Sequence, residues 1–403
     1  MGASNVVVTR APSARLIDPT PLPKGAVGRL DSLTGLRWFA AFVVFLHHVQ
    51  NLGAIPAFAP FLRYGTYGVT FFFVLSGFVL AWSYRPSTGA PTFYWRRFSR
   101  IYPSHFVALL IAIPIFYSFH PDPAQTWVKP VSFGILILSL PLIQAWWSNP
   151  VVELSGNPAA WTLTCEFFFY ALHPWIMKPF RRLSANGAIL VAAGVFVLEL
   201  VYREAMDRTP GTAWVHHIPQ PVVQLPAFVI GMCLAVAMRR GWRLSVPPIV
   251  AYALTGAFVL FLGLMAVYPL HTWIAIHILA FTPEGMVLVC ALMIAAVATR
   301  DIVGARSVLR NRFWVTLGEW SFCFYLVHAT FIYLTRSIFG PESHGWATLW
   351  WWAAMFVVGL AATAALHYFI EKPVERQLRT WWDARGAKAD AGVRVPAMSG
   401  EAA

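Results

Sequence analysis

The sequence predicts an all-α fold, a polytopic bundle of membrane-spanning helices, on the basis of its composition, its long apolar segments and its placement of basic residues. Of 403 residues, 58% are hydrophobic and 12% are charged, whereas soluble domains carry about 25% charged residues. Most lysines and arginines fall in short clusters between apolar segments, as the positive-inside rule requires. These features indicate a multi-pass protein of the cell membrane.

Eleven apolar segments are candidates for membrane helices, each of a length that suits a membrane or buried helix. They cover residues 33–52, 65–82, 101–119, 131–147, 159–177, 188–202, 222–238, 247–267, 273–298, 313–335 and 346–370. If every basic cluster is cytosolic, an even number of crossings must separate neighbouring clusters. Two segments separate every pair except the clusters 85–100 and 178–182, which three segments separate.

The weakest of those three segments is 131–147, which contains Pro141 and Gln144 and follows Pro130. A broken segment of this kind is tolerated in a membrane where protein or a cavity surrounds it. We therefore expect ten spanning helices and one re-entrant element that enters from the non-cytosolic side. Both termini are then cytosolic.

The domain organisation follows from the same pattern. Residues 1–29 form a polar cytosolic leader, residues 30–373 the transmembrane domain, and residues 374–403 a cytosolic tail that is too short for a domain core. The net charge of +13 could indicate a nucleic-acid partner, but no basic soluble domain is present to bind one. The four cysteines have no metal-ligand spacing, so we expect neither a structural metal nor a disulfide framework.

Arg37 and His48 are the polar residues of the first segment that most strongly suggest function. Their separation of eleven positions is three helical turns plus about 20°, so they share one face about 16 Å apart. His47 is rotated away by about 100°. Ionisable groups inside a membrane are costly and usually functional. From these residues alone, an alternative stays open in which Arg37 contacts lipid phosphates and His48 is a structural polar group.

Ordered motifs along the chain resemble those of the acyltransferase-3 family of bacterial membrane O-acyltransferases. They are LDSLTGLRWFAAFVVFLHHV with Arg37 and His48, GVTFFFVLSGFVL from Gly68, FYWRRFSRIYP with Arg97 and Arg100, WTLTCEFFFYALHP with Glu166, and near the C-terminus LGEWSFCFYLVH and FIEKP. Thr162 replaces the serine usual in the fourth motif and keeps its hydroxyl. The resemblance extends from Leu30 to Pro373, and LTGLRWFAA is similar to members that modify antibiotics.

The resemblance implies transfer of an acyl group from acyl-CoA, a co-substrate rather than a tightly bound cofactor, to a hydroxyl of a sugar-containing acceptor. The acceptor would be a cell-surface glycan or a glycosylated macrolide antibiotic. His48 is then the general base, with a reference pKa suited to that role, and an acyl-histidine intermediate stays open. A proton-coupled secondary transporter is the main alternative function, because intramembrane Arg, His and Glu also mark such pathways.

The remaining site candidates follow the same resemblance and its charge pattern. Arg37, Arg97 and Arg100 would bind the phosphates of coenzyme A, and Arg96 joins them because it belongs to the same cluster; a purely topological role is the alternative. Glu166, about 10 Å below the outer surface, would reach a depth similar to that of His48 and orient the imidazole or a hydroxyl. A structural ion pair with an arginine is its alternative.

Three further residues complete the predicted site as substrate-binding groups. Thr162 lies one turn before Glu166 on the same face. Tyr325 and His328 share one face of a later helix and could line the pocket, although structural hydrogen bonding is the favoured interpretation of these two.

Overall fold

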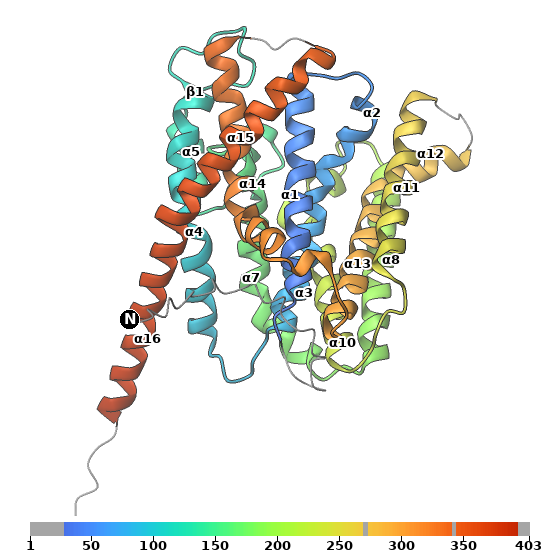
Figure 1. The fold of residues 1–403 in the computed structure, drawn as a ribbon, viewed down its shortest axis with the longest axis vertical. Helices are drawn as coiled ribbons and strands as arrows, with labels where there is room; N and C mark the ends of the chain where they lie inside the picture. Colours follow the sequence, from blue (N-terminus) through green and yellow to red (C-terminus); the bar gives the residue numbers. More distant parts are fainter. Residues whose placement is uncertain (1–27, 269–272, 341–343, 394–403) are drawn as a thin grey trace, which may run out of the picture.

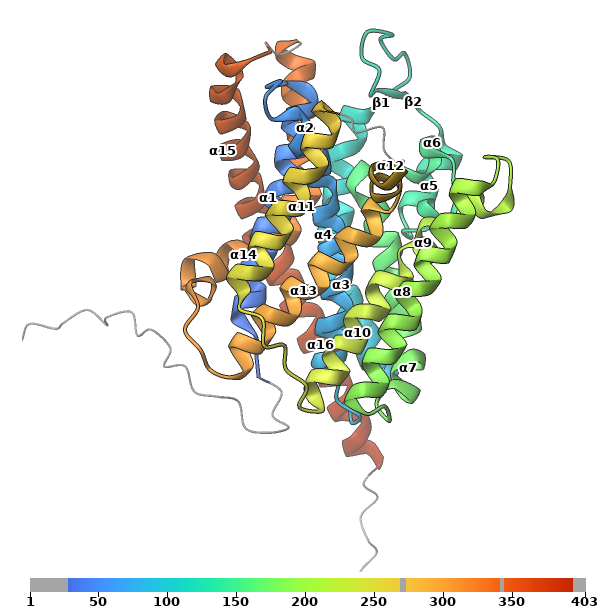
Figure 2. The same cartoon turned by 90° about the vertical axis from the view of Figure 1, so that its right-hand side faces the viewer.

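The computed structural model describes residues 28–268, 273–340 and 344–393. Nine helical segments among these residues are long and apolar enough to cross a membrane, and they run side by side along the long axis of the molecule (Figure 1, Figure 2). They are α1 (Asp31–Leu52), α2 with α3 (Ala59–Leu62, Gly68–Trp82), α4 (Ala90–Phe116), α8 (Ala185–Arg208), α9 with α10 (Gln220–Val223, Leu225–Arg239), α11 (Pro248–Val267), α13 (Thr282–Ile302), α14 (Arg312–Phe339), and α15 with α16 (Leu349–Leu366, Lys372–Val393). The predicted class, a polytopic all-α membrane protein, is confirmed.

A further helix, α7 (Trp161–Phe180), runs within the bundle but is less apolar than these nine. It carries Glu166 and Lys178 together with two internal prolines, Pro174 and Pro179. Helix α1 begins, and α16 ends, at the same end of the bundle (Figure 1). This arrangement agrees with an even number of crossings, and the assignment of that end to the cytosol stays a prediction.

The connection between α4 and α7 contains the predicted re-entrant segment. In 131–147 the described helix α5 (Phe133–Ser139) has seven residues and is followed by the short turn η2 (Gln144–Trp146), so this segment does not span as a helix. The connection also holds the strands β1 (Tyr117–Ser118) and β2 (Lys129–Pro130), paired in parallel, and the short helices α6 (Pro150–Glu153) and η3 (Pro158–Ala160). It lies in the half of the bundle where α1 ends (Figure 2).

Protein groups satisfy the irregular backbone of this connection, as a segment at membrane depth requires. The side-chain oxygen of Asn157 accepts from the backbone N–H of Ala159 at 3.0 Å, and its amide nitrogen donates to the carbonyl of Leu326 on α14 at 2.8 Å. The hydroxyl of Tyr117 accepts from the backbone N–H of Gly156 at 2.8 Å. Helix α7 therefore starts from a fixed position inside the bundle.

Two glycines allow α3 and α10 to pack backbone against backbone. A Cβ atom at Gly77 would lie 1.9 Å from the carbonyl oxygen of Phe228, and one at Gly231 would lie 1.9 Å from that of Val74. Small residues at such contacts let membrane helices approach closely. The contact fixes α3, whose opposite face contributes to the site described below.

The expected single helix over residues 273–298 is wrong, because the structure has α12 (Trp273–Ala280) and then α13 with Phe281 between them. Pro283 explains the break, since it has no N–H to continue the first helix and is placed in the first turn of the second. In the sequence, Thr282, Pro283 and Glu284 interrupt the apolar pattern at this point.

The expected boundary at residue 373 falls inside a continuous helical segment. Helix α15 passes through the π-helical turn η7 (His367–Glu371) directly into α16. The indole of Trp95 on α4 donates to the carbonyl of Leu378 at 2.9 Å and stacks on Trp382 at 5.2 Å. The first part of the expected tail is thus a helix packed on α4, whereas the leader up to residue 27 and residues 394–403 lie outside the described residues.

Candidate active site

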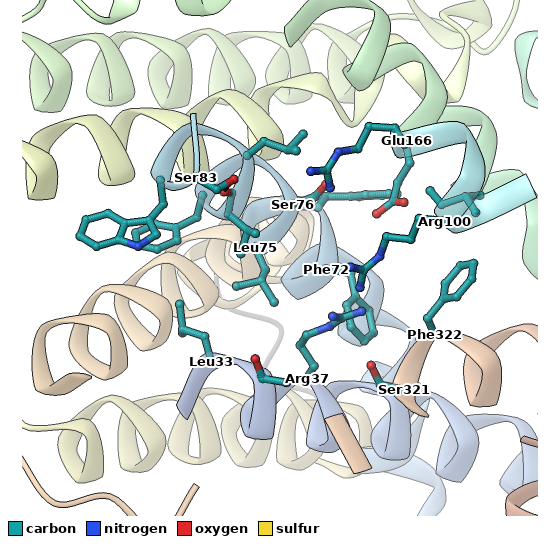
Figure 3. Close-up of a pocket in the computed structure, with 18 of the residues that line it drawn as sticks. Leu33, Arg37, Phe72, Leu75, Ser76, Ser83, Arg100, Glu166, Ser321 and Phe322 are labelled. Atoms are coloured by element: carbon teal, nitrogen blue, oxygen red, sulfur yellow. Dashed lines mark hydrogen bonds between the residues drawn. The ribbon is translucent and has the colours of Figure 1, made fainter. Parts of the chain in front are cut away.

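A cavity of about 550 Å³ lies among α1, α3, α4, α7 and α14. At one end it reaches Gly28, Ser83 and Arg85, close to the start of α1, and it extends inward to Thr162 and Tyr325. The polar side chains that line it from the helices are Thr34, Arg37, Ser76, Arg97, Arg100, Thr162, Glu166, Tyr170, Glu319, Ser321 and Tyr325. Arg37, Arg100 and Glu166 point into the same space from three different helices (Figure 3).

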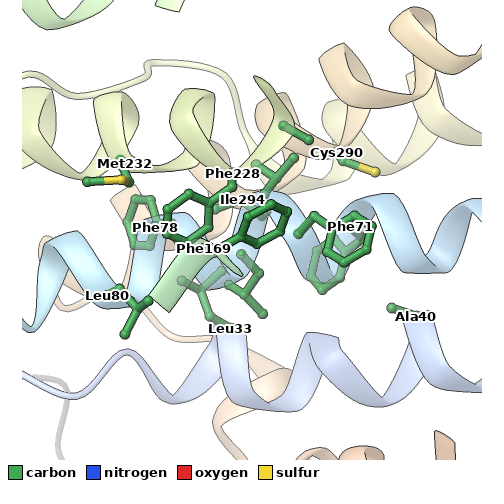
Figure 4. Close-up of a cluster of buried hydrophobic side chains, with 14 of the residues drawn as sticks. Leu33, Ala40, Phe71, Phe78, Leu80, Phe169, Phe228, Met232, Cys290 and Ile294 are labelled. Atoms are coloured by element: carbon green, nitrogen blue, oxygen red, sulfur yellow. The ribbon is translucent and has the colours of Figure 1, made fainter. Parts of the chain in front are cut away.

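The wall of this cavity is backed by tightly packed aromatic side chains. Phe169 of α7 contacts Phe73 of α3 edge to face at 5.5 Å and stacks on Phe228 of α10 at 4.7 Å. Phe78 and Leu33 lie in the same buried cluster (Figure 4). Because packed cores do not deform continuously, the helices hold the cavity-lining groups in fixed relative positions.

Three arginines in the cavity lack hydrogen-bond and ion-pair partners in the described part of the chain. Arg97 and Arg100 are three residues apart on α4 and so share a face, while Arg37 projects from α1 with its guanidinium 6.0 Å from the ring of Phe72. None of the three makes a hydrogen bond or an ion pair with another described residue, although Arg29 and Arg203 do. Arg37 and Arg100 are also close enough to repel each other. Such cations are costly inside a membrane protein unless an anion neutralises them.

Glu166 is a carboxylate that lines the same cavity as these arginines. It accepts a hydrogen bond from the hydroxyl of Tyr170 at 3.0 Å and interacts electrostatically with Arg37, Arg97 and Arg100. The described lining of the cavity holds five arginines, Arg29, Arg37, Arg85, Arg97 and Arg100, against two carboxylates, Glu166 and Glu319, so positive charge is in excess. The cavity is therefore complementary to a ligand that carries several negative charges.

Glu371 interacts electrostatically with Arg100 and does not line the described cavity. It was not among the predicted site residues. Its Oε2 atom accepts from the thiol of Cys323 at 3.1 Å and lies 2.5 Å from Nδ1 of His367. The candidate ligand atoms of these three buried residues all lie within 4.8 Å of one another, a spacing that could hold a metal ion. The nearby cation Arg100 disfavours a metal, so we interpret the group as a hydrogen-bonded support. The motif FIEKP contains Glu371, but the sequence assigns it no partner.

Arg96 is not brought into the cavity. Its guanidinium lies 3.7 Å from the carboxylate of Asp383 on α16, and its side chain is 44% exposed. Residue 96 is rotated by about 100° from residue 97, and it lies on the side of α4 that packs against α16. Arg96 is therefore not part of the cationic site.

The structure distinguishes the two neighbouring histidines of α1. Nδ1 of His47 lies 3.1 Å from the carbonyl of Leu62, and its Nε2 lies 3.1 Å from the amide nitrogen of Asn51. Both ring nitrogens of His47 are thus engaged. His48 has no hydrogen-bond partner among the described residues, and its ring lies 5.2 Å from that of His328. Of the two, His48 has the ring that is available for proton transfer.

Thr162 and Tyr325 form the inner end of the cavity. Both hydroxyls point to the carbonyl oxygen of Ala159, at 3.0 and 3.3 Å. The ring of Tyr325 lies 6.1 Å from that of His328, which in turn contacts His48. Tyr325, His328 and His48 therefore form a row of neighbouring rings, of which Tyr325 lines the cavity and the two histidines do not.

Glu166 does not approach His48 as its expected depth suggested. The ionisable neighbours of His48 are His47 and His328, whereas those of Glu166 are the arginines and Tyr170. The difference arises because α7 begins after the irregular connection, inside the bundle, and not at its surface. The expected depth of Glu166 assumed that its helix begins at the outer surface. Because α7 begins inside the bundle, Glu166 lies closer to the end at which α1 begins than that depth implied.

Comparison with known proteins identifies the family. A family described as Acyltransferase domain matches residues 30–368. Acyltransferase MdmB of Streptomyces mycarofaciens is 34% identical over 383 residues, covering 87% of this chain and 93% of the relative. Nodulation protein 10 of Rhizobium leguminosarum bv. viciae is 26% identical and covers 89% and 97%.

A further relative covers a smaller part of both chains. Peptidoglycan O-acetyltransferase OatA of Listeria monocytogenes is 26% identical over 45% of this chain and 30% of its own length. No solved structure matches the chain. The chain belongs to the acyltransferase-3 family and is an acyltransferase; the resemblance inferred from its motifs is confirmed.

Proposed function

We propose that this acyltransferase moves an acyl group from acyl-CoA to a hydroxyl of a sugar-containing acceptor, with His48 as the general base. The observation that carries the proposal is the group Arg37, Arg97 and Arg100, which line one cavity inside the bundle and make no hydrogen bond or ion pair with the described residues. The nucleotide of coenzyme A carries several phosphate charges, and guanidinium groups bind phosphate through charge-assisted hydrogen bonds. The end of the bundle with the arginines would face the cytosol, where acyl-CoA is found.

The distance along α1 suits this donor. Helix α1 is uninterrupted from Asp31 to Leu52, so the step of eleven positions from Arg37 to His48 corresponds to about 16 Å along the axis. An extended pantetheine arm is of the same order of length. Phosphates held at the arginines would therefore place the thioester near the imidazole, with Thr162 and Tyr325 lining the path.

The proposed reaction is a direct transfer. His48 takes the proton of the acceptor hydroxyl as the oxygen attacks the thioester carbonyl, and the carbon–sulfur bond then breaks. The leaving thiolate of coenzyme A takes the proton back from the imidazolium, so the enzyme returns to its starting state. Glu166 acts at the other end of the donor, where its bond to Tyr170 keeps the carboxylate beside the arginines and sets their orientation.

For the acceptor we propose a glycosylated macrolide, with a surface glycan as the second candidate. Acyltransferase MdmB is similar to this chain over nearly the full length of both, whereas the peptidoglycan O-acetyltransferase matches less than half of this chain. The motif LTGLRWFAA, which is similar to members that modify antibiotics, also favours a macrolide acceptor. Membership of an acyltransferase family argues against the alternative function of a proton-coupled transporter.

The experiment that tests the proposal uses the purified full chain in nanodiscs with radiolabelled acetyl-CoA. It is incubated in parallel with a glycosylated macrolide and with a glycan extract, and mass spectrometry identifies the acylated product. Transfer to the macrolide supports the whole proposal, and transfer to the glycan alone redirects the acceptor. Transfer from an acyl carrier protein or a simple acyl ester, together with no binding of acetyl-CoA, would overturn the donor assignment.

A further inference from the structure

His328 on α14 has a fixed tautomer. It is 1% exposed, and its Nδ1 lies 2.9 Å from the carbonyl oxygen of Phe324, one turn earlier on the same helix. A carbonyl oxygen can only accept, so Nδ1 must carry the ring proton and donate. The other nitrogen, Nε2, is then a lone-pair acceptor. It is buried and has no hydrogen-bond partner among the described residues.

Of the four aromatic rings that contact His328, that of His48 has a hydrogen-bond donor that no described residue accepts. Phe324 stacks on it at 5.5 Å and Phe45 meets it edge-on at 6.2 Å, but neither ring has an N–H or O–H group. Tyr325 lies at 6.1 Å, and its hydroxyl already donates to Ala159. His48 lies at 5.2 Å and has a ring N–H that no described residue accepts. The unmet acceptor and the unmet donor are therefore on adjacent rings.

The separation of the two rings suits a hydrogen bond between them. Two imidazoles joined in line by an N–H···N bond of about 3 Å have centroids about 5 Å apart, and the observed distance is 5.2 Å with the planes inclined by 48°. His48 can turn about its χ2 angle because no hydrogen bond within the described residues holds its ring.

We propose that His328 is a positioning residue that accepts a hydrogen bond from His48, an inference that rests on His48 being the base of the proposed function. The bond would keep the proton of His48 on the nitrogen that faces α14. The other nitrogen then presents its lone pair to the acceptor hydroxyl. When it takes the acceptor proton, His48 becomes an imidazolium that still donates to Nε2 of His328, and His328 itself neither gains nor loses a proton.

This arrangement has the logic of a triad in which a third group orients the imidazole and stabilises its charged form. A neutral imidazole replaces the usual carboxylate. Inside a membrane bundle this substitution avoids a permanent charge, which would cost about 2.5–3.5 kcal/mol on insertion scales. Glu166, the carboxylate that sequence reasoning offered for this role, is engaged with the arginines instead.

Two substitutions of His328 separate positioning from packing. His328→Asn keeps a donor near the position of Nδ1 for the Phe324 carbonyl but removes the acceptor at Nε2. His328→Gln is longer and can place an amide oxygen near the position of Nε2. We expect His328→Asn to lower kcat by about ten- to hundredfold, by analogy with the loss seen when residues that orient metal-binding histidines are removed. The donor KM should not change, and His328→Gln should recover most of the loss.

The assay includes CoA affinity, thermal unfolding and the His48→Ala variant. Unchanged kcat in His328→Asn, or equal losses in the Asn and Gln variants with a lowered unfolding temperature, would show that His328 serves packing and would overturn the inference. An active His48→Ala variant would overturn the proposed function itself. If His48→Ala is inactive while His328→Asn is unimpaired, only the positioning role fails.

Discussion

Nδ1 of His367 lies 2.5 Å from Oε2 of Glu371, and both residues belong to the π-helical turn η7 between α15 and α16. π-helical turns are rare and often occur at functional sites. Here the carboxylate of Glu371 in this turn interacts electrostatically with Arg100 on α4. The thiol of Cys323 donates a hydrogen bond to the same carboxylate, and His367 contacts it through Nδ1. The last part of the chain thus supports a cationic site built largely by helices from its first half.

Replacing His48 with alanine should abolish acyl transfer without unfolding the protein, because the ring lacks structural hydrogen bonds in the described chain. Transfer is measured with labelled acetyl-CoA, and folding by size-exclusion chromatography and thermal unfolding. His47→Ala is the matched control. It should lower stability through loss of the contacts with Leu62 and Asn51 and leave kcat within a few fold. Equal loss of transfer in two well-folded variants would contradict the assignment.

Replacing Arg37, Arg97 or Arg100 with glutamine should weaken binding of coenzyme A. A charge-assisted hydrogen bond is worth about 1.5–3 kcal/mol, so affinity should fall by about ten- to hundredfold at each position. Isothermal titration of the purified variants measures this directly. Arg96→Gln is the control, since Arg96 pairs with Asp383 outside the cavity, and its affinity should match that of the wild type. If all four variants bind coenzyme A with wild-type affinity, these arginines do not bind the donor and serve only to set the membrane topology.

Gly77→Ala should destabilise the bundle, because its Cβ would meet the carbonyl oxygen of Phe228 at 1.9 Å. Overpacking of this kind costs about 1–3 kcal/mol, which thermal unfolding in detergent would reveal as a lowered midpoint. Gly256→Ala on α11 makes the same chemical change where no atom lies within 4 Å, and its midpoint should not fall. A similar midpoint for both variants would mean that α3 and α10 are not in close backbone contact.

Single cysteines at Asp122, Asn149 and Ala384 test the topology in a cysteine-free background. All four native cysteines are buried, whereas these three positions are exposed. An impermeant thiol reagent on intact cells should label positions 122 and 149 but not 384, because the re-entrant connection returns to the side from which it entered. Labelling at 122 with protection at 149 would instead indicate an additional crossing.

The sequence predicted those features of the site that depend on local geometry. The shared face of Arg97 and Arg100 follows from three-residue spacing, and the failure of segment 131–147 to form a spanning helix follows from its prolines and from charge parity. The partner of each group could not be predicted in the same way. Glu371 reaches Arg100 through contacts between α4, η7 and α14, and Glu166 avoids His48 because an irregular connection sets where α7 begins. Such relationships depend on packing between distant segments.

The stacking of Trp95 on Trp382 links the C-terminal helix α16 to the helix that carries Arg97 and Arg100. Trp95 precedes Arg97 by two residues on α4, so an axial shift or rotation of that helix on filling of the cavity would alter the overlap of the two indoles. Their fluorescence would then respond to ligand at a site that neither ring touches. A label on α16 could follow donor binding in living membranes without altering a single residue of the cavity.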